Sequence, residues 1–172
     1  HPRAAENTLS AWSEYNMRRT ILLLPLLSAA LGCPVTQPQQ TPVDARHLTE
    51  PEADRSYWLY VPSYYDPSRS WPLVITLHGT HGWDSSRAQI KEWKHLAERE
   101  GFLVAAPKLD SVQGIVPVVR DWWYRDVRSD ERAILALLDH LCEQYSVAED
   151  RVLLTGFSAG GYPLYYTGLR NP

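Results

Sequence analysis

Residues 151–161 read RVLLTGFSAGG, and this stretch decides the fold. Val152–Leu154 is apolar throughout, which is typical of a strand covered on both faces of a sheet. Glycine stands two positions before and two positions after Ser158, at Gly156 and Gly160. Side chains at those positions would collide in a tight turn between a strand and a helix, so the pattern predicts that Ser158 stands at the tip of such a turn.

The residues of this turn allow two chemistries. A serine exposed on a strained turn can act as a nucleophile, as in the G-x-S-x-G motif. A glycine-rich turn can instead hold a phosphate at the N-terminus of the following helix. The preceding strand and the additional Gly161 favour the nucleophile, and the lack of a G-K-[ST] sequence excludes a Walker P-loop.

A second motif follows the apolar stretch Leu73–Leu77 and reads His-Gly-Thr at residues 78–80. In α/β-hydrolases the loop at this place gives one N–H to the oxyanion hole. We therefore expect the backbone N–H groups of Thr80 and Ala159 to stabilise the charge that develops on a carbonyl oxygen. This pairing of motifs favours acyl chemistry over phosphate binding.

Apolar strands alternate with amphipathic helices over the rest of the chain. A capping box at Ser86 and Gln89 predicts the start of the first helix, and Gly101 its end. Ser129 is expected to cap the second helix. This order predicts an α/β fold, a mainly parallel sheet with flanking helices joined by right-handed crossovers. The predicted strands are Tyr57–Val61, Leu73–Leu77, Phe102–Ala106 and Val152–Leu154.

From residue 55 to residue 172 the chain resembles the polyhydroxybutyrate-depolymerase and feruloyl or acetylxylan esterase-like branch of the α/β-hydrolases. The strand before His78-Gly79, the strand that ends at Pro107, and the approach through 150–152 into GFSAGG carry the resemblance. It implies an α/β-hydrolase fold with Ser158 as the nucleophile and without a metal or an organic cofactor. Its members are secreted esterases that act on polymer or plant-wall esters, so an ester is the implied substrate.

The chain departs from this family in its histidines. Triad order in the fold is Ser, then Asp or Glu, then His, but residues 159–172 contain none of these acidic or basic partners. All six histidines precede the serine; they are at positions 1, 47, 78, 81, 95 and 140. Of these, His78 is expected to brace the oxyanion loop, and His81 either lines the pocket or is exposed. Residues 55–172 are thus interpreted as the amino-terminal part of a catalytic domain, truncated after the nucleophile and inactive by itself.

Aromatic residues at Trp122 and Trp123 are placed in a predicted loop at the edge of the sheet where ligands enter open α/β folds. Their rings could bind a sugar or a phenolic acyl group there. They could equally pack beneath the loop as part of the core. The sequence leaves these two alternatives open.

The amino-terminal part has the composition of an export signal. Met17 begins a short basic region, and an apolar stretch with small residues at its end follows to Gly32, too short to span a bilayer. Residues 1–16 precede this signal peptide at 17–32. Residues 30–33, Ala-Leu-Gly-Cys, resemble a bacterial lipobox, although the usual leucine three positions before the cysteine is replaced by alanine. Either lipidation of Cys33 or ordinary secretory cleavage is therefore expected.

Residues 33–54 are rich in proline and poor in apolar side chains, which predicts a linker between the envelope and the folded domain. Cys33 would then tether the protein to a membrane. The expected location is outside the cytoplasm: secreted, periplasmic or lipid-anchored at a bacterial cell envelope.

The 172 residues are 44% hydrophobic and 22% charged, with a net charge of −3, which is a globular composition. The mild acidity disfavours nucleic acid as a partner, because phosphate binding needs clustered Lys and Arg. The leading hypothesis is an exported serine esterase that works through an acyl-enzyme. The alternatives are a serine peptidase of the same fold and a non-catalytic surface binding protein on this scaffold.

Overall fold

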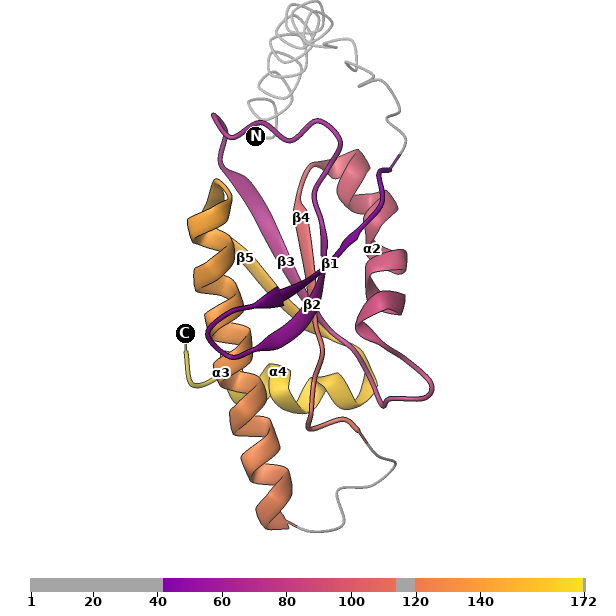
Figure 1. The fold of residues 1–172 in the computed structure, drawn as a ribbon, viewed down its shortest axis with the longest axis vertical. Helices are drawn as coiled ribbons and strands as arrows, with labels where there is room; N and C mark the ends of the chain where they lie inside the picture. Colours follow the sequence, from indigo (N-terminus) through magenta and orange to yellow (C-terminus); the bar gives the residue numbers. More distant parts are fainter. Residues whose placement is uncertain (1–41, 114–119, 172) are drawn as a thin grey trace, which may run out of the picture. The chain divides into compact units, whose positions relative to one another are not determined.

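The computed structural model describes residues 42–113 and 120–171. In this part the strands form a five-stranded sheet in the order β1-β2-β4-β3-β5, with α2 against one face and α3 and α4 against the other (Figure 1). The elements are β1 (Arg46–Glu50), β2 (Arg55–Tyr60), β3 (Trp71–Leu77), α2 (Ser86–Glu100), β4 (Leu103–Pro107), α3 (Arg120–Gln144), β5 (Val147–Gly156), η1 (Ser158–Gly160) and α4 (Gly161–Gly168).

The four predicted strands are present, and the predicted α/β class is confirmed. The sheet is mixed, however: β3 runs parallel to both β4 and β5, whereas β2 runs antiparallel to β1 and β4. The parallel half contains β5 and the elbow that follows it. This half therefore positions the candidate site.

The central strands are apolar because they are covered on both faces. Every residue of β4 is buried, as are all residues of β3 except Pro72. The larger core cluster joins the sheet to α3 through Ile134, Leu137 and Leu141, and the smaller joins it to α2 through Ile90 and Ala97. Burial on both sides explains why these strands read as continuous apolar runs.

Strand β1 lies in the stretch for which the sequence predicts a linker, so that prediction is wrong for Arg46–Glu50. The strand has few apolar residues, but all five of its residues pair with β2. Glu50 is buried, and its carboxylate accepts the N–H groups of Glu52 (2.6 Å) and Ala53 (2.7 Å) in the turn between the strands. Hydrogen bonds rather than hydrophobic periodicity define this element.

The two predicted helices, α2 and α3, both begin earlier in the chain than the sequence predicts. The N-cap of α2 is Ser85, whose side chain accepts the N–H of Ala88 at 3.2 Å. The predicted capping box of Ser86 and Gln89 is therefore wrong: the cap lies one residue earlier, and the Gln89 side chain bonds Thr76 and Asp84 instead. Gly101 ends this helix in the left-handed conformation, as predicted, with φ of 79°. Helix α3 begins at Arg120, and Ser129 lies inside it rather than at its cap.

The predicted signal peptide, Cys33 and the first part of the predicted linker lie outside the described residues. In the described part of the chain, no helix is long and apolar enough to cross a membrane.

Candidate active site

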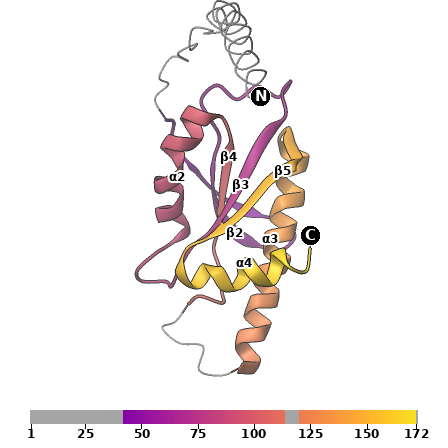
Figure 2. The same ribbon diagram turned by 180° about the vertical axis from the view of Figure 1, so that it is seen from behind.

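Ser158 stands between β5 and α4, at the start of a helical turn, as the sequence predicts. Figure 2 shows β5 leading into α4. Strand β5 ends at Gly156, η1 begins at Ser158, and α4 follows directly. The φ angle of Ser158 is 50°, in the left-handed region that residues with a β-carbon rarely occupy. Such local strain is characteristic of functional turns, and it leaves the Ser158 side chain exposed.

The glycines on either side of Ser158 leave no room for side chains. A β-carbon on Gly156 would stand 2.8 Å from the carbonyl oxygen of Gly160. A β-carbon on Gly160 would stand 2.5 Å from the carbonyl oxygen of Leu77 and 2.7 Å from that of His78. The second clash shows that the elbow is packed directly against the loop after β3.

Strand pairing brings these two segments together. Leu77 at the end of β3 is the partner of Gly156 at the end of β5, and the carbonyl of Leu77 accepts the N–H of Phe157 at 2.9 Å. Residues 78–80 and Ser158 therefore lie at the same carboxyl edge of the parallel strands. Ala159 lies in the first turn of the helical segment, where N–H groups lack an intrahelical acceptor.

A polar network that the sequence did not reveal holds residues 79–84, the loop that contains the predicted oxyanion donor Thr80 and that is called the oxyanion loop below. The N–H of Gly79 donates to Asp84 Oδ2 at 2.7 Å, and Gln89 Nε2 donates to the same oxygen at 2.8 Å. Gln89 in turn accepts the hydroxyl of Thr76 on β3 at 2.8 Å. The carbonyl of Thr80 accepts the N–H of Asp84, which closes the turn. Gln89 is buried, although the sequence indicates only a capping role for it.

His78 braces this loop, as predicted. Its ring is buried, with Nδ1 2.8 Å from the carbonyl oxygen of Gly79 and Nε2 accepting the N–H of Leu109 at 3.0 Å. Because Leu109 is a donor, Nε2 must be unprotonated and Nδ1 must carry the hydrogen. Burial lowers the pKa of His78 below its ordinary value of 6.5. The imidazole is thus neutral and fully engaged.

The other predicted binding residues are His81, Trp122 and Trp123. The His81 side chain is exposed, while its N–H donates to the carbonyl of Val112 at 3.0 Å. Trp122 and Trp123 belong to the first turns of α3 rather than to a loop, and their side chains lie outside the described residues. Trp83, for which the sequence gives no prediction, belongs to the oxyanion loop, and its exposed fraction is 74%.

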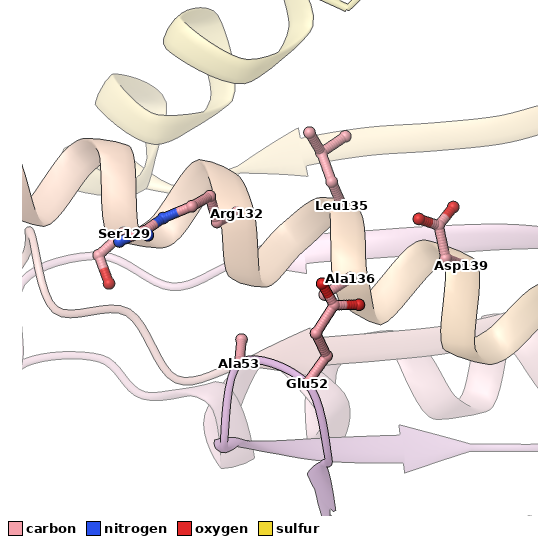
Figure 3. A pocket seen from close by; sticks show the side chains of 7 residues that line it. All are labelled: Glu52, Ala53, Ser129, Arg132, Leu135, Ala136 and Asp139. Carbon is pink, nitrogen blue, oxygen red and sulfur yellow. The ribbon is translucent and has the colours of Figure 1, made fainter.

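Two surface hollows lie elsewhere. One of about 470 Å³ separates the β1–β2 turn from α3 and is lined by Glu52, Ala53, Ser129, Arg132, Leu135, Ala136 and Asp139 (Figure 3). The other, of about 350 Å³, lies between α2 and β2. Neither is lined by Ser158 or by the oxyanion loop. Among residues 42–113 and 120–171, no cluster of three or more His, Cys, Asp or Glu side chains could hold a metal ion.

The sheet, its covering helices and the serine elbow packed on the loop after β3 define the α/β-hydrolase fold. Solved structures of this fold include a CE1 ferulic acid esterase from Anaeromyces mucronatus, with a TM-score of 0.56 and 18% identity over 77% of this chain and 55% of that chain. A thermophilic esterase from Thermogutta terrifontis has a TM-score of 0.52 and 21% identity, over 70% of this chain and 42% of that one.

A curated relative is the bifunctional acetylxylan esterase/xylanase of Neocallimastix patriciarum, 28% identical over 117 residues. The match covers 68% of this chain and 16% of that protein, and no family model matches the chain. The chain therefore spans about half the length of the ferulic acid esterase and a smaller share of the curated relative. The predicted resemblance to feruloyl and acetylxylan esterases is confirmed.

Proposed function

We propose that this chain carries the nucleophile and the oxyanion hole of a serine carboxylic ester hydrolase. The observation that carries the proposal is Ser158 with its φ of 50°, exposed on a turn whose glycines pack against residues 77–79. The similar proteins described above are esterases by name, which supports the same reaction.

In the proposed reaction the Ser158 hydroxyl attacks the ester carbonyl carbon and gives up its proton to a base. The N–H groups of Thr80 and Ala159 stabilise the oxyanion of the tetrahedral intermediate. The alcohol then leaves with a proton, and an acyl-enzyme remains. Water hydrolyses the acyl-enzyme, which releases the acid and restores the serine.

The base in this reaction is not His78. Both of its ring nitrogens are bonded to backbone groups, of Gly79 and Leu109, and burial favours its neutral form. In this fold the acid and the histidine of the triad follow the serine. We therefore place them in the portion of the esterase fold that this chain does not span, and expect residues 55–172 alone to be inactive.

The relatives direct the choice of substrate. Their names include acetylxylan and ferulic acid, so we propose an ester of a plant-wall polymer, with an acetyl or a feruloyl acyl group. An export signal at residues 17–32 would bring the protein to such a substrate. Replacing Cys33 by Ser tests the anchor: the protein should move from the membrane fraction to the soluble fraction if Cys33 is lipidated. An unchanged distribution would contradict the tether.

The test of the esterase is Ser158→Ala in the full-length gene product. We expect aryl acetate and methyl ferulate hydrolysis to fall by about four to six orders of magnitude, with folding unchanged. Ser70→Ala is the control, because Ser70 is exposed in the loop between β2 and β3 and should leave activity unchanged.

Each alternative function has its own outcome in this assay. Unchanged ester hydrolysis in Ser158→Ala would contradict the nucleophile. Faster cleavage of a peptide anilide than of the matching ester would indicate a peptidase. Retention of a polymer on the wild-type protein without any hydrolysis would indicate a binding protein.

A further inference from the structure

A buried carboxylate on α3, outside the elbow, is connected to the oxyanion loop through hydrogen bonds of the segment after β4. Asp130, in the middle of α3, has an exposed fraction of 0%. Its Oδ1 accepts the backbone N–H of Asp110 and its Oδ2 that of Ser111, both at 2.9 Å. The carboxylate therefore fixes the backbone of residues 108–113, the segment that follows β4.

Residues 108–113 in turn hold the oxyanion loop on both sides of Thr80. On one side, the N–H of Leu109 donates to Nε2 of His78 at 3.0 Å. On the other, the carbonyl of Val112 accepts the N–H of His81 at 3.0 Å. Thr80 is thus suspended between two residues that are each bonded to the segment fixed by Asp130.

Arg55 on β2 supplies the charge that makes this buried carboxylate tolerable. Its guanidinium lies 3.0 Å from Asp130 Oδ1 and 2.7 Å from Asp110 Oδ2, and it also donates to the carbonyl of Lys108 at 3.1 Å. An unpaired buried carboxylate would be strongly destabilising, whereas one with a cation and two N–H donors is satisfied. The Arg side chain thereby ties a strand, a helix and residues 108–113 together.

We propose that Asp130 is a positioning residue for the oxyanion hole, acting through residues 108–113 and His78 on the N–H of Thr80. The proposal rests on the proposed function above. Its physical reason is that an oxyanion donor works only if it is held in place before the charge develops, and displacement by about 1 Å can cost about a hundredfold in rate. A carboxylate that contacts no substrate can therefore affect kcat.

The test is Asp130→Asn in the full-length protein. The amide keeps the size of the side chain, but its nitrogen cannot accept the N–H of Ser111. The amide is also uncharged, so it cannot balance the charge of Arg55. We expect kcat for ester hydrolysis to fall by about tenfold or more, with KM changed less than about twofold. Amide hydrogen exchange at Leu109 and His81 should become about tenfold faster.

The matched control is Glu131→Gln, the next residue of the same helix. Glu131 forms its own ion pair with Arg170, at 2.9 Å, but bonds neither residues 108–113 nor the oxyanion loop in the described structure. Its kcat and the exchange at Leu109 and His81 should match the wild type. If Asp130→Asn does not fold, Arg55→Lys serves as the second variant, because it keeps the charge while losing the forked contact; the same changes are expected at smaller size.

Two results would overturn the inference: unchanged exchange at Leu109 and His81, or faster exchange with an unchanged kcat. Both differ from failure of the proposed function, which would appear as equal ester hydrolysis by the wild type and Ser158→Ala. In that event the exchange measurement still decides whether Asp130 holds the loop.

Discussion

Gly79 and Ser158 are so close that a β-carbon on residue 79 would stand 3.2 Å from the β-carbon of the serine. The same atom would lie 3.1 Å from the Phe157 ring and 3.2 Å from the Phe157 carbonyl oxygen. The elbow therefore leaves little room for a side chain at position 79 of the oxyanion loop. Each of the two motifs limits the residues that the other can contain.

Gly79→Ala should impair activity more than stability. The contacts of 3.1 to 3.2 Å are tight but not overlapping, so the neighbours must move by a few tenths of an ångström. A shift of that size between Ser158 and the oxyanion donors should lower kcat by about tenfold, with a loss of about 1 kcal/mol in unfolding free energy. Steady-state kinetics and urea denaturation would measure the two effects. A variant with wild-type kcat would contradict the prediction.

Gly160→Ala should disrupt folding instead. Its β-carbon would overlap two backbone carbonyls, of Leu77 and His78, which cannot rotate away. We expect a loss of about 3 kcal/mol or more in the urea-derived free energy of unfolding. Gly161→Ala is the control, because a β-carbon there meets nothing within 4 Å and the helical φ is −61°. That variant should be unchanged or stabilised by up to about 1 kcal/mol.

The strained backbone of Ser158 predicts a difference between two inactive variants. Alanine keeps the unfavourable φ of 50°, whereas glycine adopts it without steric cost. Ser158→Gly should therefore be more stable than Ser158→Ala by about 1 kcal/mol. Thermal and urea unfolding of the two proteins, side by side, would measure this difference. Equal stability would mean that the elbow stores no strain at this residue.

The buried His78 predicts a loss of stability in mild acid. Its native pKa is lowered by burial, so the unfolded chain binds a proton more readily below pH 6.5. The contribution of the neutral His78 to the free energy of unfolding is fully present above pH 6.5 and is lost progressively as the pH falls toward the pKa of His78 in the folded protein. Unfolding free energies measured by urea between pH 7.5 and 5 should therefore decrease.

His78→Gln identifies the source of this pH dependence. A glutamine oxygen can still accept the N–H of Leu109, but it does not titrate, so the decrease between pH 7.5 and 5 should become smaller. At pH 7.5 the variant should be less stable by about 1 kcal/mol, because the bond to the Gly79 carbonyl is weakened. His95→Gln, at an exposed position on α2, is the control and should keep the wild-type slope. An unchanged slope in His78→Gln would contradict the assignment.

The parts of the fold that could be predicted are those with local signals. Ser158 and its glycines were found because the steric demands of the turn are written into five consecutive residues. The apolar strands β3 and β4 were found because burial on both faces leaves an uninterrupted apolar run. His78 was correctly placed as a brace because it precedes the nucleophile, at a position where the α/β-hydrolase fold uses a histidine to hold the oxyanion loop.

The parts that could not be predicted depend on distant partners. Strand β1 exists through its pairing with β2, which its own polar residues do not indicate. Ser129 resembled a helix cap, but the helix continues through it, and its hydroxyl instead accepts a bond from Arg55, 74 positions away. Asp84 and Asp130 are ordinary polar residues in sequence. Only folding shows that their carboxylates hold backbone N–H groups beside the site.

The pairing of Leu77 with Gly156 has a consequence for the thermal behaviour of the site. The distance between Ser158 and the end of β3 is set by the hydrogen bonds between β3 and β5, so it should stay unchanged on heating until this β3–β5 ladder opens. The serine elbow and the pairing of these two strands are thus expected to be lost at one temperature.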